Sequence, residues 1–460
     1  MGDQLDGGVT AGCPMDDASE PAPPPAPPPV NIRVSIFFDG TGNNRANTTE
    51  RIQNTWNYRL MLSAVSGSYE NDYSNVSKLE TNFLPRANTE TEKAFSIYME
   101  GIGTSDHLSD DMTAQAVGMG GTGVKGKVNW GIDRIIDRIT EIVTNTASPL
   151  TIELDAFGFS RGAAAARYFI YQVLTHESEV LGRADNQTLQ RKLQDLHYTV
   201  NSVRIKFIGL FDTVASFGTD HSNDTTDLRL DSVRHAERVV QLAAADEHRV
   251  NFPLTNINSA SNKLEIFLPG VHSDIGGGYR EHVNESELIV YKLDNISDTP
   301  TVRSLYATTL NAEKEKLIEK GWYASSEFTQ LWNQLVVNKN GISNSYNKIP
   351  LKLMADYARE YALRFSRTVD NMSGMADVKS HIDQYIARHG SSSRASHWTD
   401  QPTAPWLRNL RTGFFHFSSY YGAWYSPEPM IPQYWSSTHG WSDSIPNRMS
   451  GERRRRVYDG

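Results

Sequence analysis

The sequence predicts an α/β fold built around a mostly parallel sheet. Short apolar runs typical of buried strands alternate along the chain with segments whose apolar residues recur at helical spacing. The chain has 460 residues, which is ample for a sizeable core and suits one large or two to three ordinary domains. Each element is taken below in chain order.

Four strands are predicted from the apolar runs. The run at Ile32–Phe38 first alternates, then fills with apolar residues, and ends in a glycine-rich turn that begins at Asp39. The other three runs are Leu150–Phe157, Val203–Phe211 and Leu264–Leu268. Near-continuous apolar strands are typical of a parallel sheet that is covered on both faces.

Helices are predicted between and after these strands. Trp130–Val143 carries an apolar stripe at helical spacing with charged residues opposite, and Arg161–Thr175 is apolar and rich in alanine. Two further segments, Ser232–His248 and Ile349–Phe365, also follow a helical rhythm.

Composition shifts divide the chain into four parts. Residues 1–31 are expected to form a flexible arm, because the proline run at Pro21–Pro29 favours polyproline II over packing. Residues 32–280 hold the alternating pattern and are expected to form the α/β core. Residues 281–345 are mixed and rich in Asn and Ser, and are expected to be an insertion or cap. Residues 346–460 are expected to form a C-terminal region that is helical at first and then irregular and aromatic. We expect most of its aromatic side chains to pack on the core, and the alternative is a lipid-facing surface.

Charge and cysteine content exclude several classes of protein. Lys and Arg number 45 against 54 Asp and Glu, a net charge of −9, so nucleic acid is a poor candidate partner. The single cysteine, Cys13, can form neither an internal disulfide nor a thiolate zinc site. No run approaches the ~18 apolar residues of a membrane span, and the acidic start lacks the basic and apolar parts of a signal peptide. We therefore expect a protein made in a cytoplasm that folds without disulfides.

A nucleophile motif lies between the second strand and the helix that follows it. Gly158–Gly162 reads G-F-S-R-G, which is G-x-S-x-G in the strand–turn–helix context that a nucleophile elbow requires. Ser160 is the candidate nucleophile. Gly158 and Gly162 support it because the strained turn leaves little room for neighbouring side chains. The alternative is a glycine-rich helix entry that merely packs tightly.

A serine nucleophile needs a base and an orienting carboxylate at the same edge of the sheet. Asp212 follows the third strand and His272 follows the fourth, so the chain order Ser, Asp, His is that of the α/β-hydrolase triad. Asp155 and Asp274 are the other candidate acids, although Asp274 is expected to brace the neighbouring glycine turn.

The remaining histidines are weaker candidates for the base. His235 and His248 fall on a predicted helix, where a solvated or packed histidine is the ordinary interpretation. His397, His416 and His439 belong to the aromatic region and could serve only if that region folds over the pocket.

Backbone N–H groups are expected to form an oxyanion hole. Arg161 would supply one from the start of its helix, and Gly40 or Thr41 a second from the loop after the first strand. Asp39 is expected to hold that loop in shape. This chemistry calls for no metal and no cofactor.

Four motifs together resemble a known family. They are F-F-D-G-T-G-N-N at Phe37–Asn44, G-F-S-R-G-A at Gly158–Ala163, G-L-F-D-T-V at Gly209–Val214 and P-G-V-H-S-D-I-G-G-G-Y at Pro269–Tyr279. The order and content are similar to the α/β-hydrolase domain family that includes the first family of type VI secretion lipase effectors. The resemblance implies an α/β-hydrolase fold and phospholipase A activity with Ser160, Asp212 and His272 as the triad.

The same resemblance implies a biological setting. The protein would be delivered by a bacterial contractile secretion machine into a rival cell, to act on membrane phospholipid at the target-cell periplasm or membrane. Its partners would be a spike protein and a cognate immunity protein. Two alternatives stay open: a soluble carboxylesterase or thioesterase acting on small acyl substrates, and a non-enzymatic spike cargo or adaptor that keeps a relic elbow.

Two further patterns are given ordinary interpretations. The glycines at Gly118–Gly123 and the segment Gly121–Lys127 resemble nucleotide-binding loops, but they lack the preceding strand and the Ser or Thr that such loops need. A glycine-rich loop near the site is expected instead. The arginines at Arg453–Arg456 are expected to be a solvated terminus rather than a contact for anionic headgroups.

Overall fold

The computed structural model describes most of the chain. The described residues are 27–61, 67–174, 188–215, 225–249, 251–290, 300–331, 334–399, 403–419, 435–436, 440–441 and 455–460. The predicted flexible arm, with Cys13, lies almost wholly outside them.

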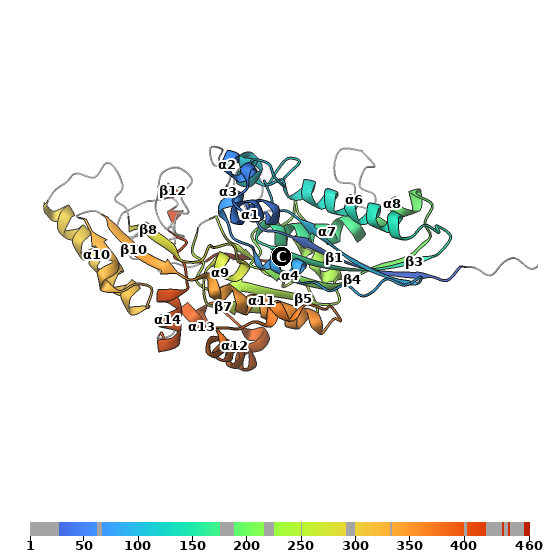
Figure 1. Cartoon of the computed structure of the whole chain (residues 1–460). Helices are drawn as coiled ribbons and strands as arrows, with labels where there is room; N and C mark the ends of the chain where they lie inside the picture. The colour runs from blue at the N-terminus through green and yellow to red at the C-terminus, as the bar shows by residue number, and fades with distance from the viewer. Residues whose placement is uncertain are drawn as a thin grey trace, which may run out of the picture.

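A six-stranded sheet forms the centre of the fold, in the order β2-β1-β3-β4-β5-β7, and every neighbouring pair in it is parallel (Figure 1). Its strands are β1 (Val30–Phe38), β2 (Glu92–Met99), β3 (Leu150–Phe159), β4 (Val200–Phe211), β5 (Val239–Ala244) and β7 (Lys263–Leu268). The carboxyl ends of parallel strands meet at one edge of the sheet, which is where sites of open α/β sheets lie. The predicted α/β class is confirmed.

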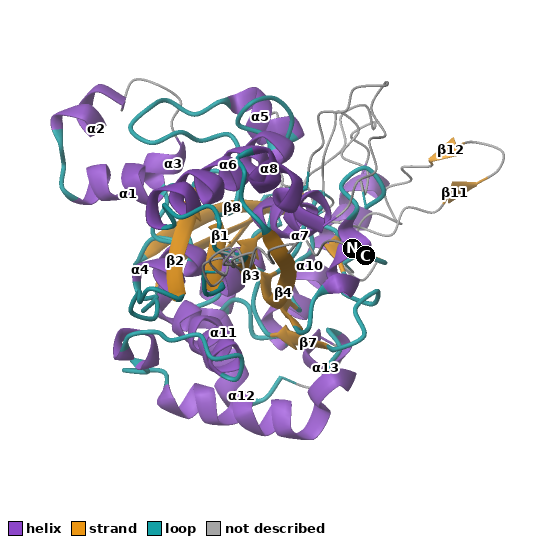
Figure 2. Cartoon of the chain, turned by 90° about the vertical axis from the view of Figure 1, so that its right-hand side faces the viewer, coloured by secondary structure: helices purple, strands orange, loops and turns teal. Residues whose placement is uncertain are grey.

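Helices cover both faces of this sheet. On one face α6 (Val124–Ile142) and α7 (Arg161–Leu174) pack against the apolar side chains of β1 and β3. On the other face lie α4 (Asn75–Thr81) and α11 (Lys348–Arg359), with the phenylalanines of the central strands. Figure 2 shows the sheet between these two layers. Burial on both faces explains why the strands read as apolar runs.

The remaining elements connect and extend this core. They are α1 (Arg45–Ile52), α2 (Trp56–Met61), α3 (Gly67–Glu70), α5 (Met112–Val117), α8 (Leu189–Asp195), η1 (Leu230–His235), β6 (Leu254–Thr255), α9 (His272–Gly276), η3 (Asn344–Asn347), η4 (Arg367–Asp370), α12 (Ala376–His389), η5 (Gly390–Ser392), α13 (Ser396–Thr399), α14 (Pro405–Gly413), β11 (Trp435–Ser436), β12 (Gly440–Trp441) and β13 (Val457–Tyr458). Within the described part of the chain, no helix combines the length and the apolar character that crossing a bilayer requires.

The stretch 281–345 contains a small antiparallel sheet in the order β8-β10-β9 and a helix, at one end of the molecule (Figure 1). Its elements are β8 (Val283–Val290), α10 (Pro300–Glu319), η2 (Ser325–Glu327), β9 (Phe328–Gln330) and β10 (Leu335–Ile342). Lys339 of β10 is buried and donates to the carbonyl of Phe415 (2.7 Å), which ties this sheet to the chain after α14. The boundaries of an insertion or cap stay a prediction.

The predicted helix at Ser232–His248 is wrong. The chain forms the short 3₁₀ helix η1 there, followed by strand β5, whose six residues are all buried. A strand covered on both faces lacks the two-residue alternation that marks a strand, so its apolar run resembled a helix face. The helix predicted over Ile349–Phe365 ends earlier, at Arg359, and the edge strand β2 has no counterpart among the predicted strands.

Aromatic residues near the end of the chain pack inward where they are described. Trp398, Phe415 and Phe417 are buried, and the Trp398 indole donates to the carbonyl of Phe267 (2.8 Å). The other tryptophans at and beyond Trp424 belong to stretches whose side chains lie outside the described residues.

One buried ion pair links β1 to β3, and its contribution to stability can be measured. Asp155 has no exposed surface and accepts two hydrogen bonds from Arg33, at 2.9 Å each, and a third from Ser35 at 3.0 Å. The Asp155→Ala variant should lose about 2–4 kcal/mol of unfolding free energy, because it leaves a largely buried guanidinium without its countercharge. Urea denaturation of the two proteins measures the difference.

Asp133 on α6 provides the control, since its pair with Lys192 is largely exposed. Its replacement by alanine should change stability by under about 1 kcal/mol. Equal denaturation midpoints for Asp155→Ala and the wild type would contradict the role given to the pair.

Candidate active site

Ser160 lies at a sharp turn between β3 and α7. Its backbone φ is +58°, in the left-handed region that residues other than glycine rarely adopt. The Ser160 N–H donates to the carbonyl of Phe211 (3.0 Å), and the Ala163 N–H donates to the carbonyl of Ser160 (3.0 Å) to open the helix. A strained strand–turn–helix connection therefore occurs at the predicted serine.

Close backbone contacts explain why glycine stands on either side of the turn. A Cβ atom on Gly158 would lie 2.4 Å from the carbonyl oxygen of Gly162, and one on Gly162 would lie 2.3 Å from that of Asp39. Both distances are far inside van der Waals contact, and both neighbours are backbone atoms that cannot move aside. The first turn of α7 thus lies directly against β3 and the loop after β1.

Asp212 and His272 meet at the carboxyl edge of the sheet. Asp212 directly follows β4, has a φ of +46° and is fully buried, whereas His272 is the first residue of α9 and is 3% exposed. The His272 Nδ1 atom lies 2.5 Å from Oδ2 of Asp212. The backbone N–H of Ala244, at the end of β5, donates to the other carboxylate oxygen (2.8 Å).

The imidazole ring of His272 is held from several sides. The ring of Phe159 lies with its centroid 4.6 Å away, and the ring of Phe252 packs edge-on at 5.0 Å. The backbone N–H of His272 donates to a carboxylate oxygen of Glu247 (3.2 Å). These contacts restrict the orientation of the ring before any ligand binds.

Ser160 and His272 line one cavity of about 380 Å³. Its wall is a mixture of polar and aromatic residues: Thr41, Asn43, Asn71, Gln115, Phe159, Ser160, Arg161, Val214, Arg249, Asn251, Phe252, His272, Ser273, Gly278 and Tyr279. Among the described residues, no group of three or more His, Cys, Asp or Glu side chains is arranged to hold a metal ion.

The loop after β1 forms part of this wall. Asp39 braces it, because its carboxylate accepts from the Gly40 N–H (2.7 Å) and from the Tyr98 hydroxyl (2.6 Å). The Arg161 Nε donates to Oγ1 of Thr41 (2.8 Å), so the loop is tied to the start of α7. Since the Gly40 N–H is used within the loop, Thr41 is the better candidate there for an oxyanion donor.

The other candidate acids have different partners. Asp155 is paired with Arg33 inside the sheet, as described above. Asp274 accepts from the backbone N–H of Val271 (2.9 Å) through one oxygen, and its other oxygen lies 3.0 Å from Nδ1 of His416. Asp274 therefore braces the turn before α9, and its imidazole partner comes from the aromatic region.

The remaining histidines lie elsewhere. His235 ends η1, and His248 lies in the turn after β5, where a helix was expected. His397 is on α13 near Tyr385, at 3.2 Å from its hydroxyl. His416 stacks on Tyr279, a residue of the cavity wall, and His439 lies outside the described residues.

Sequence reasoning missed Arg455, and the expectation of a solvated terminus is wrong for it. Its side chain is 4% exposed, and its guanidinium donates to both carboxylate oxygens of Asp212, at 2.6 and 2.9 Å. No local pattern could have revealed this pair, because 243 positions separate the two residues. Glu247, whose carboxylate binds Arg249, is a second buried neighbour of His272 that was not predicted.

Burial and charge set the protonation of the site. Burial by itself would raise the pKa of the Asp212 carboxyl, but the Arg455 charge and the hydrogen bond from His272 outweigh it, so this pKa lies below its usual value. Burial lowers the pKa of His272, and the adjacent Asp212 only partly offsets the effect. At neutral pH the pair is therefore a carboxylate and a neutral imidazole.

The tight contact at Gly162 yields a stability test. Gly162→Ala should destabilise the protein by on the order of 1–3 kcal/mol or more, because its Cβ atom would overlap the backbone of the loop after β1. Gly121→Ala is the matched control: nothing lies within 4 Å of its Cβ position, and the change should stay within about 0.5 kcal/mol. Similar thermal midpoints for the two variants would overturn the steric account.

The chain matches the family model described as "T6SS, Phospholipase effector Tle1-like, catalytic domain" in two overlapping segments, 33–191 and 168–302. No curated protein matches the chain. The predicted motifs at Phe37–Asn44, Gly158–Ala163, Gly209–Val214 and Pro269–Tyr279 all lie within the matched segments.

Two solved structures match the chain to different extents. One is described as the Tle1 effector bound to the VgrG spike from the type 6 secretion system; it is 22% identical, 95% of each chain is covered, and the TM-score is 0.59. The other is an uncharacterised protein from Pseudomonas aeruginosa, also 22% identical, with 54% of this chain and 42% of that chain covered and a TM-score of 0.39.

The first of these structures supports the α/β-hydrolase-like architecture across nearly the whole chain. The family model carries the classification, because its two segments together span more than half of the sequence. The chain belongs to the Tle1-like family of type VI secretion phospholipase effectors.

Proposed function

We propose that the protein hydrolyses acyl ester bonds of membrane phospholipids, as a phospholipase A type serine hydrolase, with Ser160, Asp212 and His272 as its triad. The observation that carries the proposal is the 2.5 Å contact between His272 and Asp212, with the imidazole lining the same cavity as a serine held at a strained turn. Membership of a phospholipase effector family supports the class of substrate.

The proposed mechanism begins with the neutral imidazole. The Nδ1–H group of His272 donates a hydrogen bond to Asp212, which leaves Nε2 as the acceptor for the proton of Ser160. The Ser160 oxygen attacks the ester carbonyl while His272 takes that proton. The N–H groups of Thr41 and Arg161 stabilise the negative charge that develops on the carbonyl oxygen.

The acyl-enzyme then forms and is hydrolysed. The tetrahedral intermediate collapses, the C–O bond to the lysophospholipid breaks, and His272 returns its proton to the leaving alkoxide. A water molecule, deprotonated by His272, then attacks the acyl-Ser160 ester. The bond between the acyl carbon and the Ser160 oxygen breaks, His272 returns its proton to that oxygen, and the fatty acid leaves. Asp212 stays ionised throughout and stabilises the imidazolium.

The proposed setting is antibacterial. A cytoplasmic lipase would endanger the membrane of the cell that makes it, so the protein would be carried out through the type VI machine and act at the target-cell periplasm or membrane. A spike protein is the proposed carrier, supported by the similar fold of an effector whose structure was solved bound to the VgrG spike. A cognate immunity protein would protect the producer.

Replacement of the nucleophile tests the reaction. Ser160→Ala should abolish fatty-acid release from vesicles of defined phospholipid while leaving the fold intact, because no other group would form the acyl-enzyme. Mass spectrometry of the released lipids measures the loss and identifies the acyl chain. Ser286→Ala, on the exposed face of β8, is the control and should retain full activity.

The result also separates the alternatives. Undiminished release of fatty acid by Ser160→Ala would contradict the proposed triad. A wild type that prefers small monomeric esters and shows no rise in rate on bilayers would be the soluble esterase or thioesterase. No release and no reaction of Ser160 with a fluorophosphonate probe would favour a non-enzymatic spike cargo or adaptor.

The pH profile tests the base. Activity needs neutral His272, whose pKa is lowered from its ordinary value of 6.5 by burial. As the pH falls, kcat/KM should therefore hold until below pH 6.5 and decline only where the buried imidazole takes up its proton. A profile of short-chain ester hydrolysis with its acid midpoint above 6.5 would contradict this assignment.

A further inference from the structure

The guanidinium of Arg455, far from Asp212 in the sequence, forms an ion pair with this candidate triad acid. Arg455 donates from its two terminal nitrogens to the two oxygens of Asp212, at 2.6 and 2.9 Å, in a paired arrangement that fixes the plane of the carboxylate. Both side chains are buried, at 4% and 0% exposure. Such a pair is not screened as a surface ion pair would be.

The same guanidinium also bonds to backbone carbonyls of two segments that contact the His272 ring or its acid partner. Its Nε donates to the carbonyl of Phe252 (2.8 Å), and a terminal nitrogen lies 3.3 Å from the carbonyl of Ala244. The Phe252 ring packs edge-on against His272, and the Ala244 N–H donates to Asp212. One side chain thus connects the acid with two of the segments that surround the base.

Backbone pairing holds Arg455 in this place. β13 pairs in parallel with β6, and the N–H of Leu254 donates to the carbonyl of Arg456 (2.9 Å). Asp459 accepts from the side-chain amides of Asn256 and Asn258, at 2.8 and 3.2 Å. The position of the guanidinium is therefore fixed by the backbone pairing of β13 with β6.

We propose that Arg455 is a positioning residue for the acyl-transfer reaction, which orients the Asp212 carboxylate toward His272 and compensates its charge while His272 is neutral. This inference rests on the proposed triad. Arg455 touches neither Ser160 nor the cavity that holds it, so it acts through Asp212. The matched family segments end at residue 302, well before this arginine.

The charge balance explains why the residue matters. Without Arg455 the buried carboxylate beside a neutral imidazole would lose the only cation bonded to it among the described residues, because the nearby Arg249 is paired with Glu247. With Arg455 present, Asp212 shares its charge between two cations once the imidazolium forms, which weakens the attraction for the imidazolium proton. The other charged groups facing His272 are Glu247 and Arg249, from the turn after β5.

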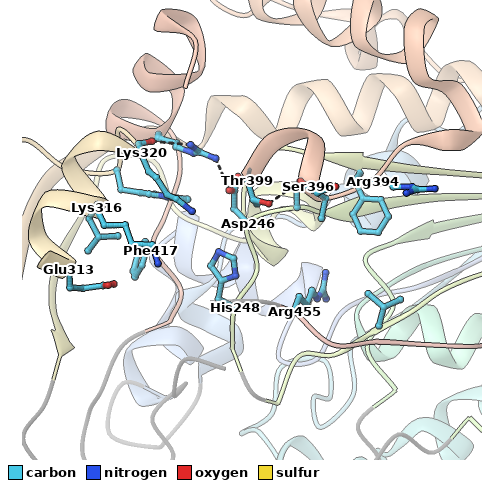
Figure 3. A pocket seen from close by; sticks show the side chains of 17 residues that line it. Asp246, His248, Glu313, Lys316, Lys320, Arg394, Ser396, Thr399, Phe417 and Arg455 are labelled. Carbon is cyan, nitrogen blue, oxygen red and sulfur yellow. Dashed lines mark hydrogen bonds and ion pairs between the residues drawn. The ribbon is translucent and has the colours of Figure 1, made fainter. Parts of the chain in front are cut away.

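Removing the guanidinium would also admit water. Arg455 borders a second cavity, of about 340 Å³, on whose wall Figure 3 shows it near His248 and across from Lys316. This cavity does not include Ser160 or His272. A shorter or apolar side chain at position 455 would open a route by which water from this cavity hydrates Asp212 and loosens its bond to His272.

The test compares Arg455→Met and Arg455→Lys in the full chain. For Arg455→Met we expect kcat for a short-chain ester to fall on the order of 10²-fold with little change in KM, since the substrate cavity is untouched. The acid midpoint of the profile should move to higher pH, because an unshared Asp212 stabilises the imidazolium. Arg455→Lys should recover part of both effects by restoring the charge without the paired geometry.

Arg456→Met is the matched control, because the adjacent side chain is exposed, and it should behave as the wild type. An acid midpoint unchanged in folded Arg455→Met would overturn the proposal, whatever its rate, since a merely structural role would lower the amount of active protein without moving the profile. If Arg455→Met does not fold, Arg455→Gln, which also removes the charge but keeps polar donors, is measured in its place. Wild-type protein without Ser160-dependent hydrolysis would instead refute the proposed function.

Discussion

The architecture of the site depends on one buried carboxylate. Asp212 has no exposed surface, so its charge must be met entirely by the protein. The donors are the Ala244 N–H, the His272 ring and the two terminal nitrogens of Arg455. They come from the end of β5, the start of α9 and the segment before β13. The sheet brings the first two to one edge, and the pairing of β13 with β6 adds the third.

Two neighbouring buried carboxylates are likewise paired with arginines. Glu247 is paired with Arg249 and Asp246 with Arg411, and all four side chains are largely or fully withdrawn from solvent. Because removing charges from water is costly, buried pairs of this kind are weak evidence for stability. Both carboxylates lie in the turn that follows β5, and Glu247 of this turn also accepts a hydrogen bond from the backbone N–H of His272.

Local patterns predicted what is local. Continuous apolar runs revealed β1, β3, β4 and β7, and the elbow could be located because its strand, serine and helix are adjacent in sequence. The same reasoning failed at β5, since a strand buried on both faces carries no two-residue alternation. Partnerships between distant segments left no pattern at all: the bond of Asp274 to His416 and that of Asp212 to Arg455 depend on how the last part of the chain returns to the sheet.

The pairing of β13 with β6 determines the order in which the parts of the site can come together during synthesis. Ribosomes make chains from the N-terminus, and domains begin to fold as they emerge. The sheet, the elbow and the His272 loop can assemble before residue 455 exists, but until then Asp212 has no guanidinium beside it. The site therefore reaches its finished geometry only after residue 455 has been made, and a shorter nascent chain lacks the cation that is paired with Asp212.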